Sequence, residues 1–591
     1  MSPVKGLLRR SCLAMLLLGI SACGGGSGGG SAATPDATPV AAPPSPPTTD
    51  SSDTPESEVP PTQDFPPELR GIMGASRLAS RATFGADFKT IERIETVGQE
   101  EWIEEQFELP LTSHDAEVEI LLAREAAGEF DALRQSQDND NLAAVYGRMA
   151  WWHTTITAED QLRQRVAYSL SQIFVISDEV NALLLSPFGT SNYYDMLLSH
   201  AFGNVRDLLR DVTLHPAMGL YLSHVNNARS DPESGTFPDE NYAREAMQLF
   251  SIGLFELNAD GSEQLGSDGQ PVPTYDNNDI REFAKIFTGL SWGGENNRFG
   301  SDRYNFTEPM RMFDAFHEPG EKVLLRGLTV PAGQDGLTDI EAAIDNLFMH
   351  PNIAPFLGKQ LIQRLVTSNP SPDYVARVSA AFDNNGSGER GDMRAILRAI
   401  LFDPEALAEP DPESSFGKLR EPLLRYTAML RQLGVSSPDG FYANLGFFVQ
   451  QLIQQHPLSA PSVFNFYSPR HQPIGELAEQ GLVSPELQIT NSNSIVEVSN
   501  LMRYAVVADL VNDLSDPPFL KAGLTLGDFL PLADDVDALI TRLDTVFTYG
   551  TLSADTRNAV RELIELLEEP ELRIRIAAYL VLISPDYAVE S

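Results

Sequence analysis

Two glutamates and an arginine form the densest cluster of chemically active side chains, in the segment 239–250. Glu240 and Glu245 supply carboxyl groups that can serve as general acid and general base when their surroundings separate their pKa values. Arg244 lies between them and would bind an anionic group if the helix faced a cleft. On an exposed helix, Glu240 and Arg244 would instead form a surface ion pair that contributes about 0.3 kcal/mol. The sequence leaves both interpretations open.

A histidine and a lysine occur in the segment 291–332, which lacks a helical pattern and is rich in Gly, Asn and Asp. His317 and Lys322 lie near acidic residues there, and a histidine in such a setting can act as a base or as a ligand. Surface turns contain the same residue types. Long irregular segments inside compact domains are often functional, so His317 is a candidate catalytic residue.

Two further charged residues, Asp279 and Arg281, open a helix predicted at 278–289. They would reach the same region if the chain on either side folds back onto itself. We therefore expect a cleft in which Glu240, Glu245 and His317 are the catalytic residues. The substrate-binding residues of this cleft would be Arg244, Asp279, Arg281 and Lys322.

Two familiar motifs occur in contexts that argue against their usual roles. The segment 289–293, GLSWG, matches a hydrolase pattern that requires a strand before the serine and a helix after it, whereas here a predicted helix precedes it and a polar loop follows. Asp383, Asn385 and Ser387 resemble the first ligands of a calcium loop, but its twelfth position is Arg394 instead of glutamate. The sequence favours a turn between helices over a calcium site, and it identifies no cofactor.

Charge and cysteine content exclude several classes of protein. The 591 residues include 42 Lys and Arg against 83 Asp and Glu, which gives a formal charge of −41. A polyanion repels phosphate backbones, so we expect no nucleic-acid partner. Hydrophobic residues make up 42% of the chain, which is enough to bury a large core. The two cysteines, Cys12 and Cys23, lie near the N-terminus, so we expect no disulfide in the fold.

The first residues have the pattern of a lipoprotein signal peptide. A basic segment precedes the apolar run 11–20, whose length as a helix is about 15 Å, roughly half the thickness of the membrane interior. The run leads into ISAC, residues 20–23, which resembles the lipobox of bacterial lipoproteins. We predict removal of residues 1–22, lipidation of Cys23 and attachment to the cell envelope. Gly24 after the cysteine favours the outer membrane.

A tether and a helical fold follow the expected lipid anchor. Residues 23–63 are rich in Gly, Ser and Pro and cannot bury enough apolar surface to fold. Beyond them, apolar residues such as Leu162, Val166 and Leu170 recur at helical spacing. Helices are predicted with the following bounds: 159–176, 239–252, 278–289, 338–349, 353–367, 392–402, 417–433 and 554–568.

The predicted fold class is all-α, a multi-helix orthogonal bundle with one small β-hairpin. Two Asp-Gly pairs in the segment 255–274 favour the hairpin. A boundary near residue 335 would separate an N-terminal lobe, 64–335, from a C-terminal lobe, 336–591, with a cleft between them.

Four segments resemble a bacterial family called domain of unknown function 1800. They are RLASRATFG at 77–85, the helix at 239–253, the segment 279–292 ending in TGLSW, and FHEPGEK at 316–322. The resemblance extends from about residue 70 to the C-terminal LISPDY. Aspartate is frequent in the family where Glu318 stands here. The resemblance implies no assigned activity. It does imply an exported partner that resembles alkaline phosphatases or sulfatases.

Two hypotheses of different class follow, and whether the protein is an enzyme stays open. In the first, the chain is a lipid-anchored extracytoplasmic accessory or binding protein that works with another exported protein. In the second, it is a hydrolase that acts on a surface or extracellular polymer through the Glu/Arg/His cleft. The lack of nucleotide-binding and zinc-protease motifs favours the first. Convergence of the candidate residues on one pocket would favour the second.

Overall fold

The computed structural model describes residues 71–131, 142–233, 235–408, 414–438, 440, 442, 449–450, 452–509 and 522–590. The expected signal peptide, Cys23 and the tether at 23–63 lie outside these residues. By its internal contacts, the chain from Pro66 to Ser591 is one compact unit. None of the described helices is long and apolar enough to cross a membrane.

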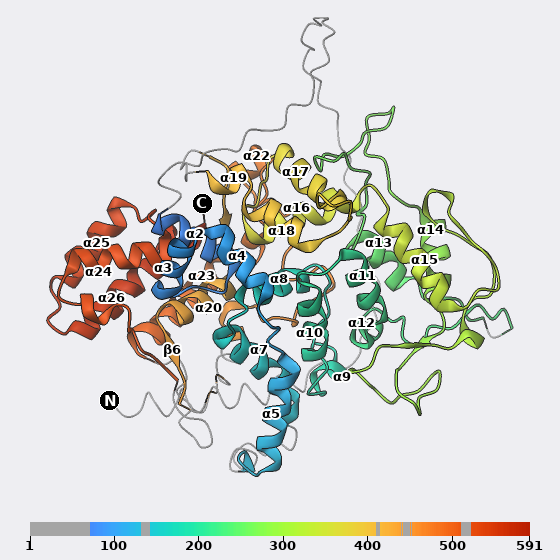
Figure 1. The fold of residues 1–591 in the computed structure, drawn as a ribbon, viewed down its shortest axis with the longest axis horizontal. Helices are drawn as coiled ribbons and strands as arrows, with labels where there is room; N and C mark the ends of the chain where they lie inside the picture. Colours follow the sequence, from blue (N-terminus) through green and yellow to red (C-terminus); the bar gives the residue numbers. More distant parts are fainter. Residues whose placement is uncertain are drawn as a thin grey trace, which may run out of the picture. The chain divides into compact units, whose positions relative to one another are not determined.

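Helices dominate the first half of the described chain (Figure 1). They are α2 (Ile72–Ala82), α3 (Phe88–Val97), α4 (Gln99–Glu108), α5 (His114–Ala126), η2 (Leu142–Val145), α7 (Tyr146–Thr157), α8 (Gln161–Ser171), α9 (Asn181–Leu184), α10 (Ser191–His200), α11 (Val205–Leu214), α12 (Pro216–Tyr221), α13 (Asn241–Gln248) and α14 (Asn277–Ile286).

The second half continues the helical pattern after an irregular stretch. Its helices are η3 (Asp314–Phe316), η4 (Leu325–Gly327), α15 (Gly336–Phe348), α16 (Ile353–Leu365), α17 (Pro372–Asp383), α18 (Met393–Leu401), α19 (Pro404–Leu407), α20 (Pro422–Gln432), α22 (Glu476–Glu479), η5 (Pro485–Gln488), α23 (Ser492–Met502), η6 (Arg503–Val507), η7 (Leu530–Leu532), α24 (Val536–Leu543), η8 (Asp544–Thr548), α25 (Ala554–Ile564), α26 (Pro570–Leu582) and α27 (Pro585–Ala588).

Each sheet among the described residues has two short antiparallel strands. The pairs are β1 (Leu290–Ser291) with β2 (Arg311–Met312), β3 (Lys322–Val323) with β4 (Thr329–Val330), β5 (Lys418–Leu419) with β8 (Val589–Glu590), and β6 (Val435–Ser436) with β7 (Gly523–Leu524). The predicted all-α class with small hairpins is therefore confirmed.

Every predicted helix exists, although several bounds differ. The predicted helix at 417–433 begins only at Pro422, because Lys418 and Leu419 pair with β8 across a long sequence separation. The helix predicted from residue 239 begins at Asn241. The expected hairpin at 255–274 is present as isolated antiparallel bridges, including Phe255 with Pro273.

The expected boundary near residue 335 does not divide the contacts of the fold. α11 and α14, from before this position, both pack against α15, which follows it. One hydrophobic cluster includes Ala75 from α2 and Tyr587 from α27. The two ends of the described chain also meet, since the Ser76 hydroxyl donates to the carbonyl of Thr545 over 2.5 Å. In Figure 1 the blue α2 and α3 lie beside the red α24 to α26.

Buried cations bind the carbonyl groups at the C-terminal ends of several helices. At α16, Arg165 and Lys418 donate to the carbonyl of Arg364 over 2.7 and 2.9 Å. At α19, Arg77 donates to the carbonyl of Ala408 over 2.7 Å. The last carbonyl groups of a helix have no hydrogen-bond partner within the helix, and they carry partial negative charge. A buried cation at this end therefore donates the missing hydrogen bonds and also balances the charge.

The same arrangement joins later parts of the chain. Arg575 on α26 donates to the carbonyl of Val506 at the end of η6 over 2.7 Å. Arg431 on α20 donates to the carbonyl of Gly85 over 2.7 Å and also to that of Ile156 near the end of α7. These side chains hold together helices that are distant in sequence.

The helices α5 and α10 each provide an aspartate that accepts hydrogen bonds from the first residues of the other helix. Asp195 of α10 accepts from the backbone N–H of His114 over 2.7 Å at the start of α5. In return, Asp115 of α5 accepts from the Ser191 hydroxyl and the Asn192 side-chain amide, each over 2.5 Å. Burial raises the pKa of Asp115 to about 6, although the hydrogen bonds from Asn192 and Ser191 oppose the shift.

We predict that the free energy of unfolding depends on pH through Asp115. Its pKa is higher in the folded protein than the ordinary value, so the folded state binds the extra proton and stability rises as the pH falls from about 6 to about 4. Asp115→Asn should remove this increment. Urea unfolding of the wild type and the variant at pH 7.5 and pH 4.5 measures it. If the free energy of unfolding of the two proteins differed by the same amount at both pH values, the assignment to Asp115 would be contradicted.

Candidate functional site

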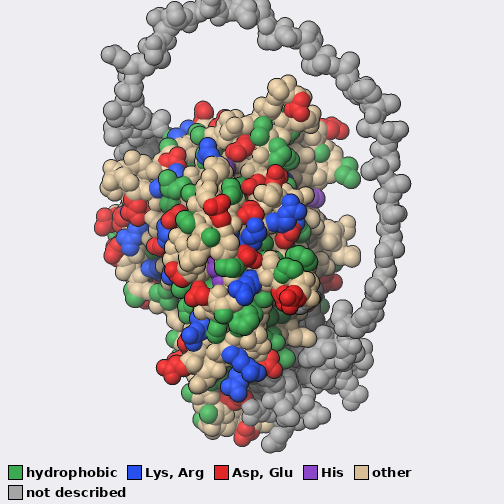
Figure 2. All heavy atoms as spheres, turned by 90° about the vertical axis from the view of Figure 1, so that its right-hand side faces the viewer, with side chains coloured by type: hydrophobic (Ala, Val, Ile, Leu, Met, Phe, Trp, Pro, Cys, Tyr) green, Lys and Arg blue, Asp and Glu red, His purple; other side chains and the backbone are tan. Residues whose placement is uncertain are grey.

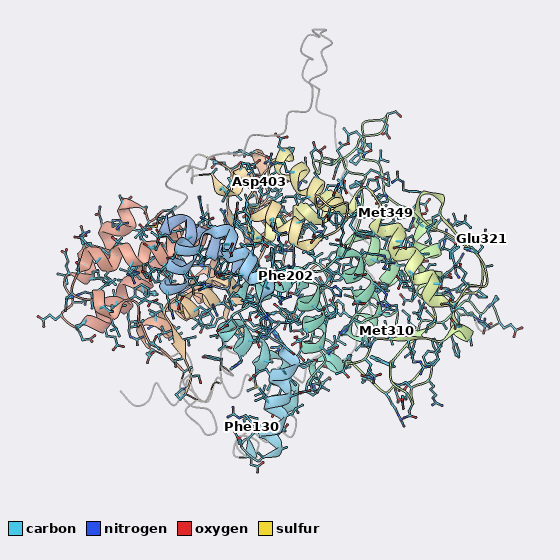
Figure 3. All side chains as sticks on the ribbon, in the orientation of Figure 1. Phe130, Phe202, Met310, Glu321, Met349 and Asp403 are labelled. Carbon is cyan, nitrogen blue, oxygen red and sulfur yellow. The ribbon has the colours of Figure 1, made fainter. Side chains whose placement is uncertain are left out.

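An irregular stretch between α14 and α15 forms most of one surface of the fold. We call the surface made by residues 223–233, 235–239 and 289–335 the loop face. Met310 and Glu321 mark it in Figure 3. Its chain is fixed to the helical core, because the backbone N–H of Met310 donates to the carbonyl of Leu214 over 2.8 Å at the end of α11.

Asn226 organises the centre of the loop face. Its φ of 63° lies in the left-handed region, which asparagine tolerates better than most residues. Its side-chain oxygen accepts from the Ser291 hydroxyl over 2.5 Å and from the backbone N–H of Gly300 over 3.0 Å. Its backbone N–H donates to the carbonyl of Leu290 over 2.8 Å. One residue thus connects the segment after α12 to β1 and to the loop that follows it.

Asn227 connects the start of α13 to the same region. Its side-chain oxygen accepts from the backbone N–H of Asp239 over 2.9 Å. Its carbonyl accepts from the backbone N–H of Gly289 over 2.8 Å. Two of the segments singled out from the sequence, 239–253 and 279–292, are therefore joined through a residue that lies in neither.

His317 and Lys322 meet an aspartate on α15 that the sequence did not single out. His317 Nε2 lies 2.9 Å from Asp339 Oδ2, and Lys322 Nζ contacts the same oxygen. His317 Nδ1 lies 2.9 Å from the carbonyl of Thr288. All three side chains are buried, with exposures of 2%, 1% and 0% for His317, Lys322 and Asp339.

Two glycines enclose the histidine ring. A Cβ atom on Gly289 would lie 3.0 Å from the Cβ of His317, and its φ of 86° already favours glycine. A Cβ atom on Gly336 would lie 3.0 Å from Cγ of the same ring and 2.5 Å from the Met312 sulfur. The ring therefore occupies a close-fitting slot between β1 and the start of α15.

The electrostatics of this cluster favour an ionised aspartate. Burial opposes ionisation of Asp339, but hydrogen bonds from Lys322, His317 and Gln334 outweigh it and hold the pKa of the carboxyl group below its ordinary value. Gln334 Nε2 donates to Asp339 Oδ1 over 2.8 Å, and Lys322 Nζ donates to the carbonyl of Glu318 over 2.5 Å. Both carboxylate oxygens are thus partnered, as a buried charge requires.

The glutamates of α13 do not join this cluster. Glu240 and Arg244 form an ion pair of 3.6 Å in which both side chains are more than 40% exposed. Glu245 is buried, its Oε2 has no hydrogen-bond partner among the described residues, and burial raises its pKa. No hydrogen bond or ion pair found among those residues connects Glu245 to His317.

The predicted residues at the start of α14 have other positions. Asp279 belongs to a capping box, in which its Oδ2 accepts from the backbone N–H of Asp276 over 2.8 Å. Arg281 is exposed on the same helix. Of the seven expected cleft residues, His317 and Lys322 meet in the buried cluster, whereas Glu240 and Arg244 pair with each other at the surface.

The two motifs that the sequence argued against have local structural roles. Ser291 is buried in β1, preceded by α14, and its hydroxyl donates to Asn226. In the turn after α17, Asn385 accepts from the Ser387 hydroxyl over 2.7 Å, while its amide donates to Asp392 over 2.8 Å. Asp383 pairs with Arg390. These oxygens are partnered by neighbouring side chains within a turn that joins α17 and α18.

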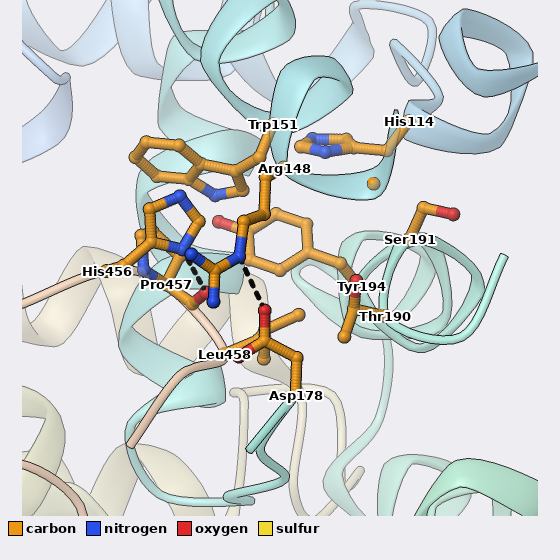
Figure 4. A pocket seen from close by; sticks show the side chains of 11 residues that line it. His114, Arg148, Trp151, Asp178, Thr190, Ser191, Tyr194, His456, Pro457 and Leu458 are labelled. Atoms are coloured by element: carbon orange, nitrogen blue, oxygen red, sulfur yellow. Dashed lines mark hydrogen bonds and ion pairs between the residues drawn. The ribbon is translucent and has the colours of Figure 1, made fainter. Parts of the chain in front are cut away.

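Sequence reasoning missed a polar hollow between α7, α10 and the segment 456–458 (Figure 4). Arg148 Nε donates to Asp178 Oδ2 over 2.7 Å, and His456 accepts from the indole N–H of Trp152 over 3.2 Å. Burial holds the pKa of His456 well below its ordinary value. The hollow offers space on the order of one water molecule. His456 lies 304 residues after Trp152, so no motif spacing could have revealed that they meet.

The fold and its sites define a large helical protein in which three of the four segments singled out from the sequence, 239–253, 279–292 and 316–322, lie in or beside the elements that hold an irregular surface in place. The chain belongs to the family described as Protein of unknown function (DUF1800), which it matches over residues 77–589. The resemblance inferred from the four segments is therefore confirmed. No curated protein and no solved structure matches the chain.

We predict that Lys322→Met lowers the free energy of unfolding by about 3 kcal/mol, because it leaves Asp339 buried beside one cation fewer. Urea denaturation at pH 7 measures the change. Lys285→Met is the matched control, since Lys285 pairs with Glu282 over 2.5 Å at a more exposed position and should cost less than about 1 kcal/mol. If both substitutions lowered the free energy of unfolding by the same amount, the buried ion pair would stabilise the protein no more than the exposed one does.

Proposed function

We propose that this protein is a lipid-anchored extracytoplasmic accessory or binding protein that contacts another exported protein through its loop face. The supporting observation is that an irregular surface is held in place by a buried Lys322–Asp339–His317 cluster and still exposes large aromatic side chains. Phe237, Tyr304 and Phe316 are 75%, 56% and 41% exposed. A surface that is fixed before binding loses less conformational entropy on association.

The aromatic residues of the loop face lie on connected segments. The carbonyl of Phe316 accepts from the backbone N–H of Arg229 over 2.8 Å, and Asp231 pairs with Thr236 just before Phe237. Phe316 stacks on Phe299 with ring centroids 3.9 Å apart. Exposed aromatic side chains are typical anchors of protein interfaces.

The surface on the side of α14 and α15 carries charges of both signs, which suits contact with another protein. Figure 2 looks at the molecule from the side on which α14 and α15 lie in Figure 1, and acidic, basic and hydrophobic side chains are interspersed there. A mixed surface of this kind fits a folded protein better than a uniformly charged polymer. The partner that we propose resembles alkaline phosphatases or sulfatases.

A hydrolase remains the second candidate, and one observation favours it. Glu245 is a buried carboxyl group whose pKa is raised by burial and whose Oε2 has no hydrogen-bond partner among the described residues, and a raised pKa suits a carboxyl group to general acid catalysis. Its helix also carries one of the family segments. His317, another of the three proposed catalytic residues, is buried and already contacts the carbonyl of Thr288 and the carboxyl group of Asp339.

We expect Cys23→Ala to abolish lipid attachment and to release the protein from the membrane fraction, because the lipobox supplies the proposed anchor. Metabolic labelling with a fatty acid, followed by fractionation, measures both effects. Retention of label or of membrane association by the variant would refute the proposed anchor.

The double variant Phe237→Ser/Phe316→Ser should lose a co-purifying exported protein that the wild type retains after extraction from its native membrane. Leu566→Ser is the matched control, since Leu566 is 77% exposed on the turn after α25. Quantitative mass spectrometry of the eluates and complementation of a deletion strain measure the outcome. Full binding and complementation by the double variant would refute the loop face as the contact site.

The hydrolase hypothesis has its own test. A Glu245→Gln variant that keeps the melting temperature of the wild type but fails to complement the deletion strain would favour the hydrolase.

A further inference from the structure

The buried cluster around Asp339 has the arrangement needed to form an amide bond between two side chains. Lys322 supplies an amino group in direct contact with Asp339 Oδ2. Gln334 Nε2 donates to the other oxygen, Oδ1, over 2.8 Å. His317 Nε2 lies 2.9 Å from Oδ2 and 3.3 Å from Lys322 Nζ. We propose that Lys322 and Asp339 condense to an intramolecular isopeptide bond.

The reaction balances without an added reagent. A proton passes from the ammonium group of Lys322 to the carboxylate of Asp339, which makes both groups neutral. The Nζ lone pair then attacks Cγ of Asp339, so that the Nζ–Cγ bond forms. The Cγ–Oδ2 bond breaks, and Oδ2 leaves as water with the second proton from Nζ. No oxidant, reductant or nucleotide is required.

His317 is placed to transfer both protons. Its Nδ1 faces the carbonyl of Thr288 at 2.9 Å, and a carbonyl oxygen only accepts, so Nδ1 carries the hydrogen. Nε2 contacts Asp339 Oδ2 and also lies within reach of Nζ, so it can exchange a proton with either group. The ring can accept a proton from Nζ and deliver it to the departing oxygen.

Gln334 is placed to stabilise the intermediate. When Nζ attacks, negative charge develops on Oδ1, the oxygen that remains in the product. The Gln334 amide already donates to this oxygen. A donor fixed in advance at the position of the developing charge lowers the barrier without reorganisation.

The product amide also fits the site better than the ion pair does. A secondary amide has one N–H and one carbonyl oxygen. The carbonyl of Glu318, 2.5 Å from Nζ, can accept from the N–H, and Gln334 donates to the oxygen. The condensation removes two buried charges whose desolvation is costly. Because the site excludes water, the reverse hydrolysis is slow once the bond has formed.

A cross-link at this position would constrain the fold as a disulfide does, and the described residues include no cysteine. Lys322 lies on β3 in the loop face, and Asp339 lies in the first turn of α15, 17 residues later. A covalent link between them restricts the unfolded chain and fixes the loop face to the helical core. This inference does not rest on the proposed function.

The test is a tryptic map of the full chain prepared under denaturing conditions. Without the cross-link, cleavage after Arg311, Lys322, Arg326 and Lys359 yields peptides 312–322, 323–326 and 327–359. With it, trypsin cannot cleave after the acylated lysine. We expect a branched species in which 312–326 is joined to 327–359, lighter by one water than the two together. Mass spectrometry with fragmentation identifies the linked residues.

Lys322→Arg is the control, since it keeps the charge and the tryptic site but cannot form the amide. Its map should contain 312–322 and 327–359 as separate peptides. His317→Gln, which removes the proton carrier, should leave most of the chain unlinked. Recovery of free 312–322 and 327–359 from the wild type, with no branched species, overturns the proposal whatever the variants do.

Discussion

The structure depends on a small number of buried cations that bind backbone carbonyl groups at the ends of helices. Helix C-termini leave carbonyl oxygens without partners, and a tightly packed interior holds little water to satisfy them. Arg165 and Lys418 at the end of α16 and Arg575 at the end of η6 solve this problem. Each also connects two elements that are distant in sequence. The chain has a formal charge of −41, so basic residues are outnumbered by acidic ones, and several of the basic residues are nevertheless buried in the interior.

The segments that resemble the family have structural roles in this arrangement. Arg77, in the first segment, donates to the carbonyl of Ala408. Gly85, at the end of the same segment, has a φ of 118°, and a Cβ atom there would lie 2.5 Å from the Cα of Ala428. The third and fourth segments meet where Gly289 closes on His317. In these cases the family segments hold together parts of the fold that are distant in sequence.

The sequence predicted the helices well but not the pairing of distant segments, and the two outcomes have different causes. Leu162, Val166 and Leu170 of α8 are all buried, because the period of a helix turns such residues to one side. The helix expected at 417–433 was too long, since Lys418 and Leu419 pair with residues near the C-terminus. Periodicity carries no information about such distant pairing.

The sequence by itself determined the helical class, the family and the charge balance, because these depend on composition, local period and short motifs. Only the tertiary structure decided that Lys322 and His317 meet Asp339, that Glu245 is buried with no partner for Oε2 among the described residues, and that His456 and Arg148 of α7 line one hollow. The environment of a charged side chain is set by whatever elements pack against it. Those elements come from parts of the chain whose separation in sequence leaves no local signal.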